Sequence, residues 1–175
     1  MATPGKLGFR VLPSPPRLDD ALVARFRGLA SSNLADAMGR FNFMVFVGTC
    51  TGGRVVDFHE ALDAFERAGG TVAAGVQLVL TPASREVEQR LIADGTLERF
   101  VRAGAIVTTA GCGACCGTSG VLPGDGATVL STANRNFKAR MGNPTAQIYL
   151  ASPAACGAAA ATGRIPPDVP GETAS

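Results

Sequence analysis

Hydrophobic positions along the chain follow two spacings in turn, one typical of buried strands and one typical of amphipathic helices. The apolar run Met44–Gly48 has the length of a buried strand and ends in glycine. In the next segment, residues 54–68, apolar side chains recur at intervals of three and four, as on one face of a helix: Val55, Phe58, Leu62 and Phe65. Gly69 and Gly70 follow this segment, and glycine commonly ends a helix. The pattern therefore predicts a strand followed by a helix.

The same alternation continues toward the C-terminus. Strands are predicted at Val76–Leu80, Ile106–Thr109, Val129–Ser131 and Ile148–Leu150. Helices are predicted from Ser84, at Thr96–Ala103, and from Pro153 to about Thr162. Strands that alternate with helices through right-handed crossovers form parallel sheets covered on both faces. We therefore predict an α/β fold, a three-layer α/β/α domain with a mainly parallel sheet.

The N-terminal part has a different texture. Residues 1–19 contain four prolines and predict an irregular arm. A helical stripe follows between Leu22 and Leu29, and a second short helix is predicted at Leu34–Arg40. The predicted organisation is an irregular arm with a helical segment over 1–43, the α/β domain over 44–167, and a flexible tail over 168–175.

Composition narrows the possible functions. The 175 residues are 46% hydrophobic and 17% charged, which suits one folded domain rather than a disordered chain. The net charge is +2 without a basic run, so nucleic-acid binding is not expected. No apolar run approaches the ~20 residues of a membrane span, and we expect no membrane association. Five cysteines without an export signal predict a reducing, cytoplasmic location.

Three cysteines carry the candidate chemistry. Cys50 follows the first predicted strand, and Cys112 and Cys115 lie in a glycine-rich stretch after the third. Because sites in parallel sheets lie beyond the carboxyl ends of the strands, these thiols can reach one crevice. A close pair with a distant third suits a metal site better than a disulfide framework. Three thiolates on a cubane iron–sulfur cluster would leave one iron open to a substrate.

Other uses of the cysteines stay open at this point. A C-x-x-C pair also serves zinc or a redox dithiol, and a zinc site would need Cys156 or His59 as its fourth ligand. We expect Cys116, adjacent to Cys115, to be a small buried residue whose thiol points elsewhere. Cys156 is expected to be a small buried residue of the last helix, and His59 a partly exposed helix residue.

A second unusual segment spans residues 131–144 and reads Ser-Thr-Ala-Asn-Arg-Asn-Phe-Lys-Ala-Arg-Met-Gly-Asn-Pro. It places Arg135 and Arg140 five residues apart, with Asn134 beside the first. Guanidinium groups bind carboxylates through paired, charge-assisted hydrogen bonds. Composition alone favours two surface cations.

Four motifs follow one another along the chain: Gly-Thr-Cys-Thr-Gly-Gly-Arg, Gly-Cys-Gly-Ala-Cys, the 131–144 segment and Tyr-Leu-Ala-Ser-Pro-Ala. Together they resemble the aconitase superfamily, most closely the large subunit of 3-isopropylmalate dehydratase and homoaconitase, and the resemblance covers about Val45–Pro167. It implies a [4Fe–4S] cluster on Cys50, Cys112 and Cys115. It also implies reversible dehydration of a hydroxy di- or tricarboxylic acid. Arg135 and Arg140 then resemble the substrate-binding arginines, and Asn134 is a candidate contact to cluster or substrate.

The chain departs from the family pattern at four positions near these motifs. Gly52 stands where asparagine is common, Ala114 where proline is common, and Ala139 where glycine is common. Cys116 stands where the family usually has an aliphatic residue. None of these changes removes a cysteine that the resemblance assigns to the cluster.

The resemblance covers only part of the family's large subunit, which is more than twice this length. The family's acid–base residues lie in preceding domains and in a separate swivelling domain or small subunit, so no catalytic residue is assigned here. Residues 22–44 instead resemble the family of ribonuclease-activity regulator A and 4-hydroxy-4-methyl-2-oxoglutarate aldolases. We expect a hydro-lyase that needs these partner domains and takes a small hydroxy-carboxylate. A non-catalytic iron–sulfur or zinc module, or a degenerate fusion fragment, is the alternative.

Overall fold

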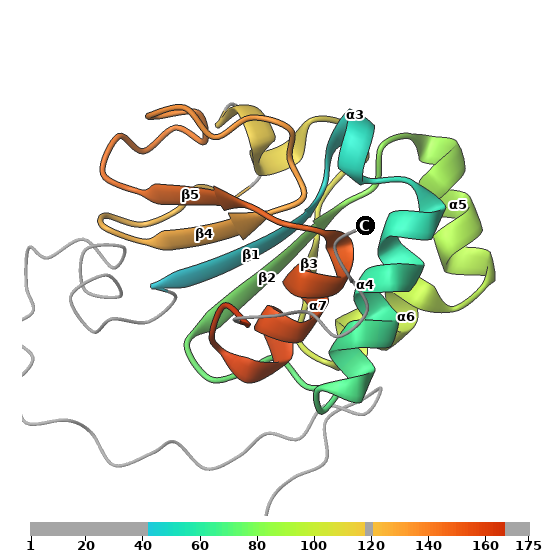
Figure 1. The fold of residues 1–175 in the computed structure, drawn as a ribbon. Coiled ribbons are helices and arrows are strands. Elements are labelled where there is room, and N and C mark those ends of the chain that lie inside the picture. Colours follow the sequence, from blue (N-terminus) through green and yellow to red (C-terminus); the bar gives the residue numbers. More distant parts are fainter. Residues whose placement is uncertain (1–41, 118–120, 167–175) are drawn as a thin grey trace, which may run out of the picture. The chain divides into compact units, whose positions relative to one another are not determined.

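A computed structural model describes residues 42–117 and 121–166, which form a five-stranded sheet with helices (Figure 1). The strands are β1 (Phe43–Gly48), β2 (Val76–Thr81), β3 (Ile106–Val107), β4 (Thr128–Ser131) and β5 (Gln147–Leu150). Their order across the sheet is β3-β2-β1-β4-β5, and every neighbouring pair is parallel. The predicted α/β fold with a parallel sheet is therefore confirmed.

Within the described residues, four helices and two short helical turns lie between or after the strands. The helices are α4 (Val55–Arg67), α5 (Arg85–Ala93), α6 (Thr96–Arg102) and α7 (Pro153–Thr162). The turns are α3 (Thr49–Gly52) and the 3₁₀ helix η2 (Gly113–Cys116). The helices agree with the predicted segments to within one or two residues at each end. The turns were not predicted, because four residues are too few to show a helical period.

The central strand β1 is buried on both faces. Val45 and Val47 face the cluster of side chains that α4, α6 and α7 contribute. Met44 and Phe46 face the opposite cluster. Side chains of a strand alternate between the two faces, so one apolar run supplies both parts of the core. This explains why the run Met44–Gly48 shows no polar alternation.

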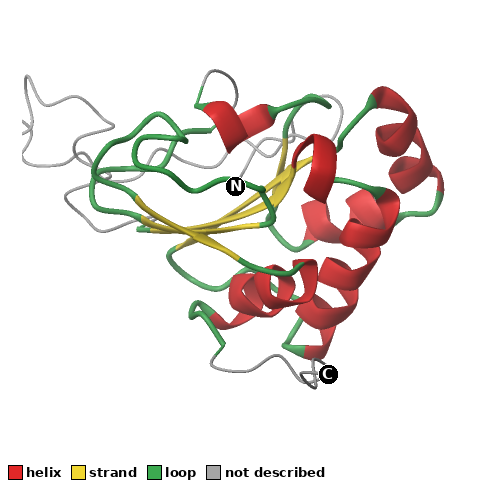
Figure 2. Cartoon of the chain, turned by 45° about the horizontal axis from the view of Figure 1, so that its top comes forward, coloured by secondary structure: helices red, strands yellow, loops and turns green. Residues whose placement is uncertain are grey.

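The two faces are covered differently. Helices α4 to α7 lie on one face, and η2 with the loops around it lies on the other (Figure 2). The second face is filled by small and flexible side chains, namely Ala114, Ala133 and Met141. Within the described residues, loops and a 3₁₀ turn thus take the place of a second layer of long helices. The stretches 108–127 and 132–146 are rich in glycine and polar residues, which disfavours helices there.

The predicted N-terminal arm, the helices before residue 42 and the tail lie outside the described residues. The resemblance of residues 22–44 to a second family therefore concerns a segment of which only the last three residues are described. None of the helices that the structure describes is long and apolar enough to cross a membrane.

Helices α4 and α7 pack closely because α7 is built from small residues. Gly157 of α7 lies directly against α4, where a Cβ atom would stand 2.0 Å from the carbonyl oxygen of Ala61. The obstructing atom belongs to the backbone of a helix, so a side-chain rotation cannot make room. Any larger residue at this position must push the two helices apart.

We therefore expect Gly157→Ala to lower the free energy of unfolding. Helix propensity alone would stabilise the variant by about 1 kcal/mol, but overpacking of a core costs about 1–3 kcal/mol, and the contact with Ala61 makes overpacking the larger effect. Urea denaturation measures the difference. Ala158→Gly, one residue further along α7, is the control and should cost about 1 kcal/mol through propensity. A stabilised Gly157→Ala variant would contradict the close packing of α4 and α7.

Candidate metal centre at the carboxyl edge of the sheet

Cys50 lies on a tight turn that begins at the end of β1. Gly48 closes the strand, and α3 starts at the next residue (Figure 1). Thr49 has a left-handed φ of 88°, which is unusual and costly for a β-branched residue. A Cβ atom on Gly48 would stand 2.5 Å from the carbonyl oxygen of Thr81, so only glycine fits beside β2. The turn places the Cys50 side chain on the surface.

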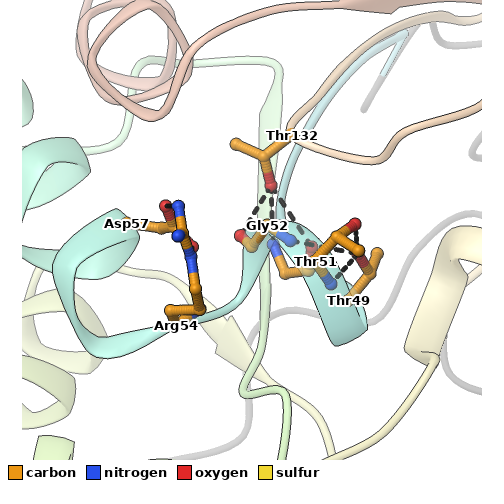
Figure 3. A network of polar contacts seen from close by, with 7 residues as sticks. Thr49, Thr51, Gly52, Arg54, Asp57 and Thr132 are labelled. Atoms are coloured by element: carbon orange, nitrogen blue, oxygen red, sulfur yellow. Dashed lines mark hydrogen bonds and ion pairs between the residues drawn. The ribbon is translucent and has the colours of Figure 1, made fainter.

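The hydroxyl of Thr132 ties this turn to the end of β4 (Figure 3). Its oxygen accepts a hydrogen bond from the N–H of Gly48 at 3.0 Å, and the hydroxyl lies 3.0 Å from the carbonyl oxygen of Gly52. A Cβ atom at position 52 would stand 2.3 Å from the carbonyl oxygen of Thr132. This close approach gives a physical reason for glycine at position 52.

Arg54 and Asp57 fix the start of α4 immediately after the turn (Figure 3). The buried carboxylate of Asp57 accepts a hydrogen bond from the backbone N–H of Arg54 at 2.9 Å. It also accepts two from the Arg54 guanidinium, at 2.8 and 3.0 Å. This hydrogen bonding, and the negative charge of Asp57, raise the pKa of Arg54. Asp57 thus makes one half of a capping box, in which the side chain of the third helical residue accepts from the backbone N–H of the N-cap residue.

Cys112 and Cys115 lie on a loop that only glycines allow to pack as it does. Gly113 has a φ of 53°, and a Cβ atom there would stand 2.3 Å from the Thr81 hydroxyl. Gly117 has a φ of 64°, and its Cβ would stand 2.4 Å from the backbone nitrogen of Gly142. The loop therefore lies directly on the second face of the sheet. Cys115 is buried in it, whereas Cys112 is exposed.

The thiols from the two separate strand ends lie within electrostatic reach of one another. The pKa of Cys112 is raised by desolvation first, and then by the negative charges of Cys116, Cys50 and Cys115. Cys50 thus interacts with a thiol 62 positions later in the chain (112 minus 50). A metal must displace the thiol proton before it binds, and a bound metal reverses this repulsion.

Cys116 differs from its predicted role. It is half-buried rather than buried, and its negative charge is one of the causes that raise the pKa of Cys112. The expectation that its thiol points away from the site is therefore wrong. Cys116 is the last residue of the η2 turn, which follows Cys112 directly.

Arg140 is the candidate substrate residue that the structure brings to the cysteines. Its Nη2 donates a hydrogen bond to the Sγ of Cys115 at 3.4 Å, and its guanidinium lies 5.6 Å from the ring centroid of Phe137. Its Nε is buried and has no hydrogen-bond partner among the described residues. Arg135 and Asn134 are exposed on the loop after β4. Ala139, before Arg140, has a left-handed φ of 64°, the conformation that glycine adopts most easily.

The extra ligands that a closed zinc site would need are engaged elsewhere. Cys156 is fully buried in α7, as predicted, and burial raises the pKa of its thiol far above the usual range. His59 is half-exposed on α4, also as predicted, and its Nε2 lies 2.9 Å from a carboxylate oxygen of Asp94. In residues 42–117 and 121–166, no three His, Cys, Asp or Glu side chains are grouped to hold a single ion.

Three thiols are the donors that hold cluster iron, so the donor chemistry is of the type that such a group needs. Thiolates on different irons of a cluster lie further apart than ligands that share one ion. Cys50 and Cys115 each contribute to the raised pKa of Cys112, and among the described residues no three such side chains are grouped around a single ion. The Arg140 guanidinium beside Cys115 would offset part of their negative charge.

The comparisons with known proteins agree on one family. The family described as Aconitase family (aconitate hydratase) matches residues 38–163. The chain is 50% identical over 121 residues to 3-isopropylmalate dehydratase large subunit 1 of Thermotoga maritima, which covers 69% of this chain and 28% of that protein. It is 42% identical over 130 residues to the homoaconitase large subunit of Thermus thermophilus, which covers 74% of this chain and 31% of that protein. The chain thus spans less than a third of the length of these two curated relatives.

Proposed function

Since this chain belongs to the aconitase family, we propose that its described residues form the iron–sulfur domain of a hydro-lyase of the 3-isopropylmalate dehydratase type. Cys50, Cys112 and Cys115 are the proposed ligands of a [4Fe–4S] cluster. The observations that support this best are the hydrogen bond from Arg140 to Cys115 and the contributions of Cys50 and Cys115 to the raised pKa of Cys112. The relatives named 3-isopropylmalate dehydratase and homoaconitase large subunit support the proposal of a hydro-lyase.

The proposed substrate is a small hydroxy di- or tricarboxylic acid. A bound cluster would supply a Lewis-acidic iron for the departing hydroxyl. Arg135 and Arg140 would bind the carboxylates through their planar guanidinium groups, with Asn134 as a further contact. Phe137 lies against the Arg140 guanidinium and limits its orientations. The buried Nε of Arg140 leaves one donor to be satisfied when the site is complete.

Proton transfer is the part of the reaction that the described residues do not supply. Dehydration removes a hydroxyl group together with a proton from the neighbouring carbon, so a base must accept that proton. His59 of α4, the single histidine of the chain, is hydrogen-bonded to Asp94, which follows α5. We therefore propose that the base comes from partner domains or from a small swivelling subunit. A cytoplasmic location, which the five cysteines predict, would keep the thiols reduced.

The alternative is a non-catalytic iron–sulfur module or a degenerate fragment. The observation that favours it is that no three His, Cys, Asp or Glu side chains of the described residues are grouped to hold a metal ion. Cluster content separates a degenerate fragment from the other two possibilities. Activity after addition of partner chains separates a module from an enzyme domain.

We expect anaerobic reconstitution of the chain to give a brown protein with about four irons and four sulfides. Serine in place of Cys50, Cys112 or Cys115 should remove the cluster or reduce its content severalfold, because serine is a poor cluster ligand. Iron and acid-labile sulfide analysis provides the measurement. Cys156→Ser tests a buried thiol outside the site, and Cys116→Ser tests the neighbouring thiol; both should keep the full iron content. Stoichiometric zinc without sulfide in the reconstituted chain would sink the cluster proposal.

In the assembled enzyme we expect Arg135→Lys and Arg140→Lys to weaken substrate binding about tenfold or more each. Lysine keeps the charge but loses the planar pair of donors, and tenfold corresponds to about 1.4 kcal/mol. The measurement is KM and kcat with the partner chains present. Arg164→Lys is the matched control, because this exposed arginine follows α7 at the opposite end of the sheet. Unchanged KM and kcat for both site variants would count against the assignment.

The purified chain alone should hold the cluster but show little or no hydro-lyase turnover. General acid–base catalysis is worth about 10²–10⁴-fold, and the positioning that other domains provide adds more. An assay of 3-isopropylmalate isomerisation, with and without candidate partner chains, tests this. Robust turnover by the chain alone would show that it carries its own base. Failure to gain activity with partners, despite a loaded cluster, would favour the non-catalytic module.

A further inference from the structure

Thr132 joins two segments that carry different parts of the proposed centre. Its hydroxyl oxygen accepts from the Gly48 N–H at 3.0 Å. The hydroxyl has two carbonyl acceptors in reach, Gly52 at 3.0 Å and Gly48 at 3.3 Å. Its backbone N–H donates to the Phe46 carbonyl at 3.0 Å, so the residue is fixed to β1 by main chain and side chain together. Figure 3 shows the hydroxyl aimed into the turn.

The bonded positions lie on either side of Cys50. Gly48 precedes the turn and Gly52 ends it, so the hydroxyl spans the turn that carries the thiol. The turn is four residues long, and Thr49 holds a left-handed φ of 88°. Its own side-chain bonds are long, because the Thr49 hydroxyl accepts from the N–H groups of Thr51 and Gly52 at 3.4 Å each. A strained conformation persists only when its surroundings hold it in place, and Thr132 adds shorter bonds from outside the turn.

Thr132 also begins the loop that leads to the arginines. It follows β4 directly, and Asn134 and Arg135 come next in the same loop. Arg140 lies eight positions after Thr132. A change in the Cys50 turn would therefore be transmitted to this loop through two hydrogen bonds and the close contact at Gly52.

We propose that Thr132 is a positioning residue that holds the Cys50 turn and the arginine loop in one fixed arrangement. Its hydroxyl sets where the first cluster ligand lies relative to the carboxylate-binding side chains. The roles of Cys50 and the arginines rest on the proposed function. The hydrogen-bonded link itself does not, and it can be tested in the chain without metal.

The test compares Thr132→Val, which keeps the shape but loses the hydroxyl, with Thr132→Ser, which keeps the hydroxyl. Trypsin cleaves after arginine, and cleavage between Arg54 and Val55 requires local opening of the turn and of the start of α4. In the metal-free chain we expect Thr132→Val to be cut there about tenfold faster, with Thr132→Ser close to the unmodified chain. Mass spectrometry follows this bond alone.

Thr162→Val is the matched control, because it also removes a hydroxyl bonded to backbone carbonyls, at the far end of α7. It should leave cleavage at Arg54 unchanged. In the cluster-loaded chain, the visible absorbance should bleach severalfold faster in air for Thr132→Val than for Thr132→Ser. If Thr132 acted only on overall stability, Thr132→Val would lower the urea midpoint. Cleavage of distant bonds would then accelerate as much as cleavage at Arg54.

Equal cleavage rates at Arg54 for the Val and Ser variants would overturn the inference, whether or not the cluster forms. If the unmodified chain takes up no cluster, the proposed function fails, and the cleavage rates still decide the role of Thr132. If Thr132→Val does not fold, amide hydrogen exchange of Gly48 in the unmodified chain decides. Protection as strong as that of Phe46 supports the link, and exchange as fast as that of an exposed loop amide contradicts it.

Discussion

Strand β1 is buried on both of its faces, and the positions of the other elements follow from that burial. Val45 and Val47 need a helical layer against them, and Met44 and Phe46 need a second cover on the opposite side. Burial of each such side chain contributes about 1.5–3 kcal/mol. The strand must therefore be central, with β2 and β4 paired to its two edges. A central position also sends its carboxyl end, and with it Cys50, to the middle of the sheet edge.

Glycine makes the crowding at this edge possible. Gly48 lies against Thr81, Gly52 against Thr132, and Gly113 against Thr81 from the other side. At each position a Cβ atom would stand within 2.5 Å of an atom of another residue. Where that atom belongs to the backbone, rotation of a side chain cannot relieve the clash. The loops can therefore carry their thiols close to one another only if these positions have no side chain. Glycine in folded structure costs conformational entropy, so this edge sacrifices some stability for close approach.

How much the sequence could predict depended on the length of each pattern. The boundaries of α4 agree with the prediction because a helical period is visible over its thirteen residues. Helix α7 has no such period, and its prediction rested on Pro153 at its start and on its alanine-rich composition. The turns α3 and η2 were missed because they have four residues each, which is too few to show a helical period. Cys116 is the last residue of η2, and its predicted burial was wrong as well. The density of glycine in residues 111–117 was the one available signal of tight packing there.

The sequence could predict at which edge of the sheet the candidate ligands lie, but it could not predict which side chains they contact there. Cysteines after strand ends could be expected at one edge, since topology alone places them there. The contact between Arg140 and Cys115 depends instead on the left-handed turn at Ala139 and on the packing of Gly117 against Gly142, neither of which has a sequence period. Thr132 shows the same limit, because a single hydroxyl in a loop gives no pattern to read.

The fold and the proposed centre are energetically separable in this domain. Small metal-dependent domains such as zinc fingers have no core without their ion, and metal binding is then their folding free energy. Here Cys50 and Cys112 are exposed at the sheet edge, while the apolar core lies between the sheet and α4, α6 and α7. Desolvation first, and then the negative charges of neighbouring thiols, raise the pKa of Cys112, so its charged form is disfavoured without a metal. The core, rather than the cluster, must therefore hold the thiols together, and a cluster would bind to an edge that is already in place.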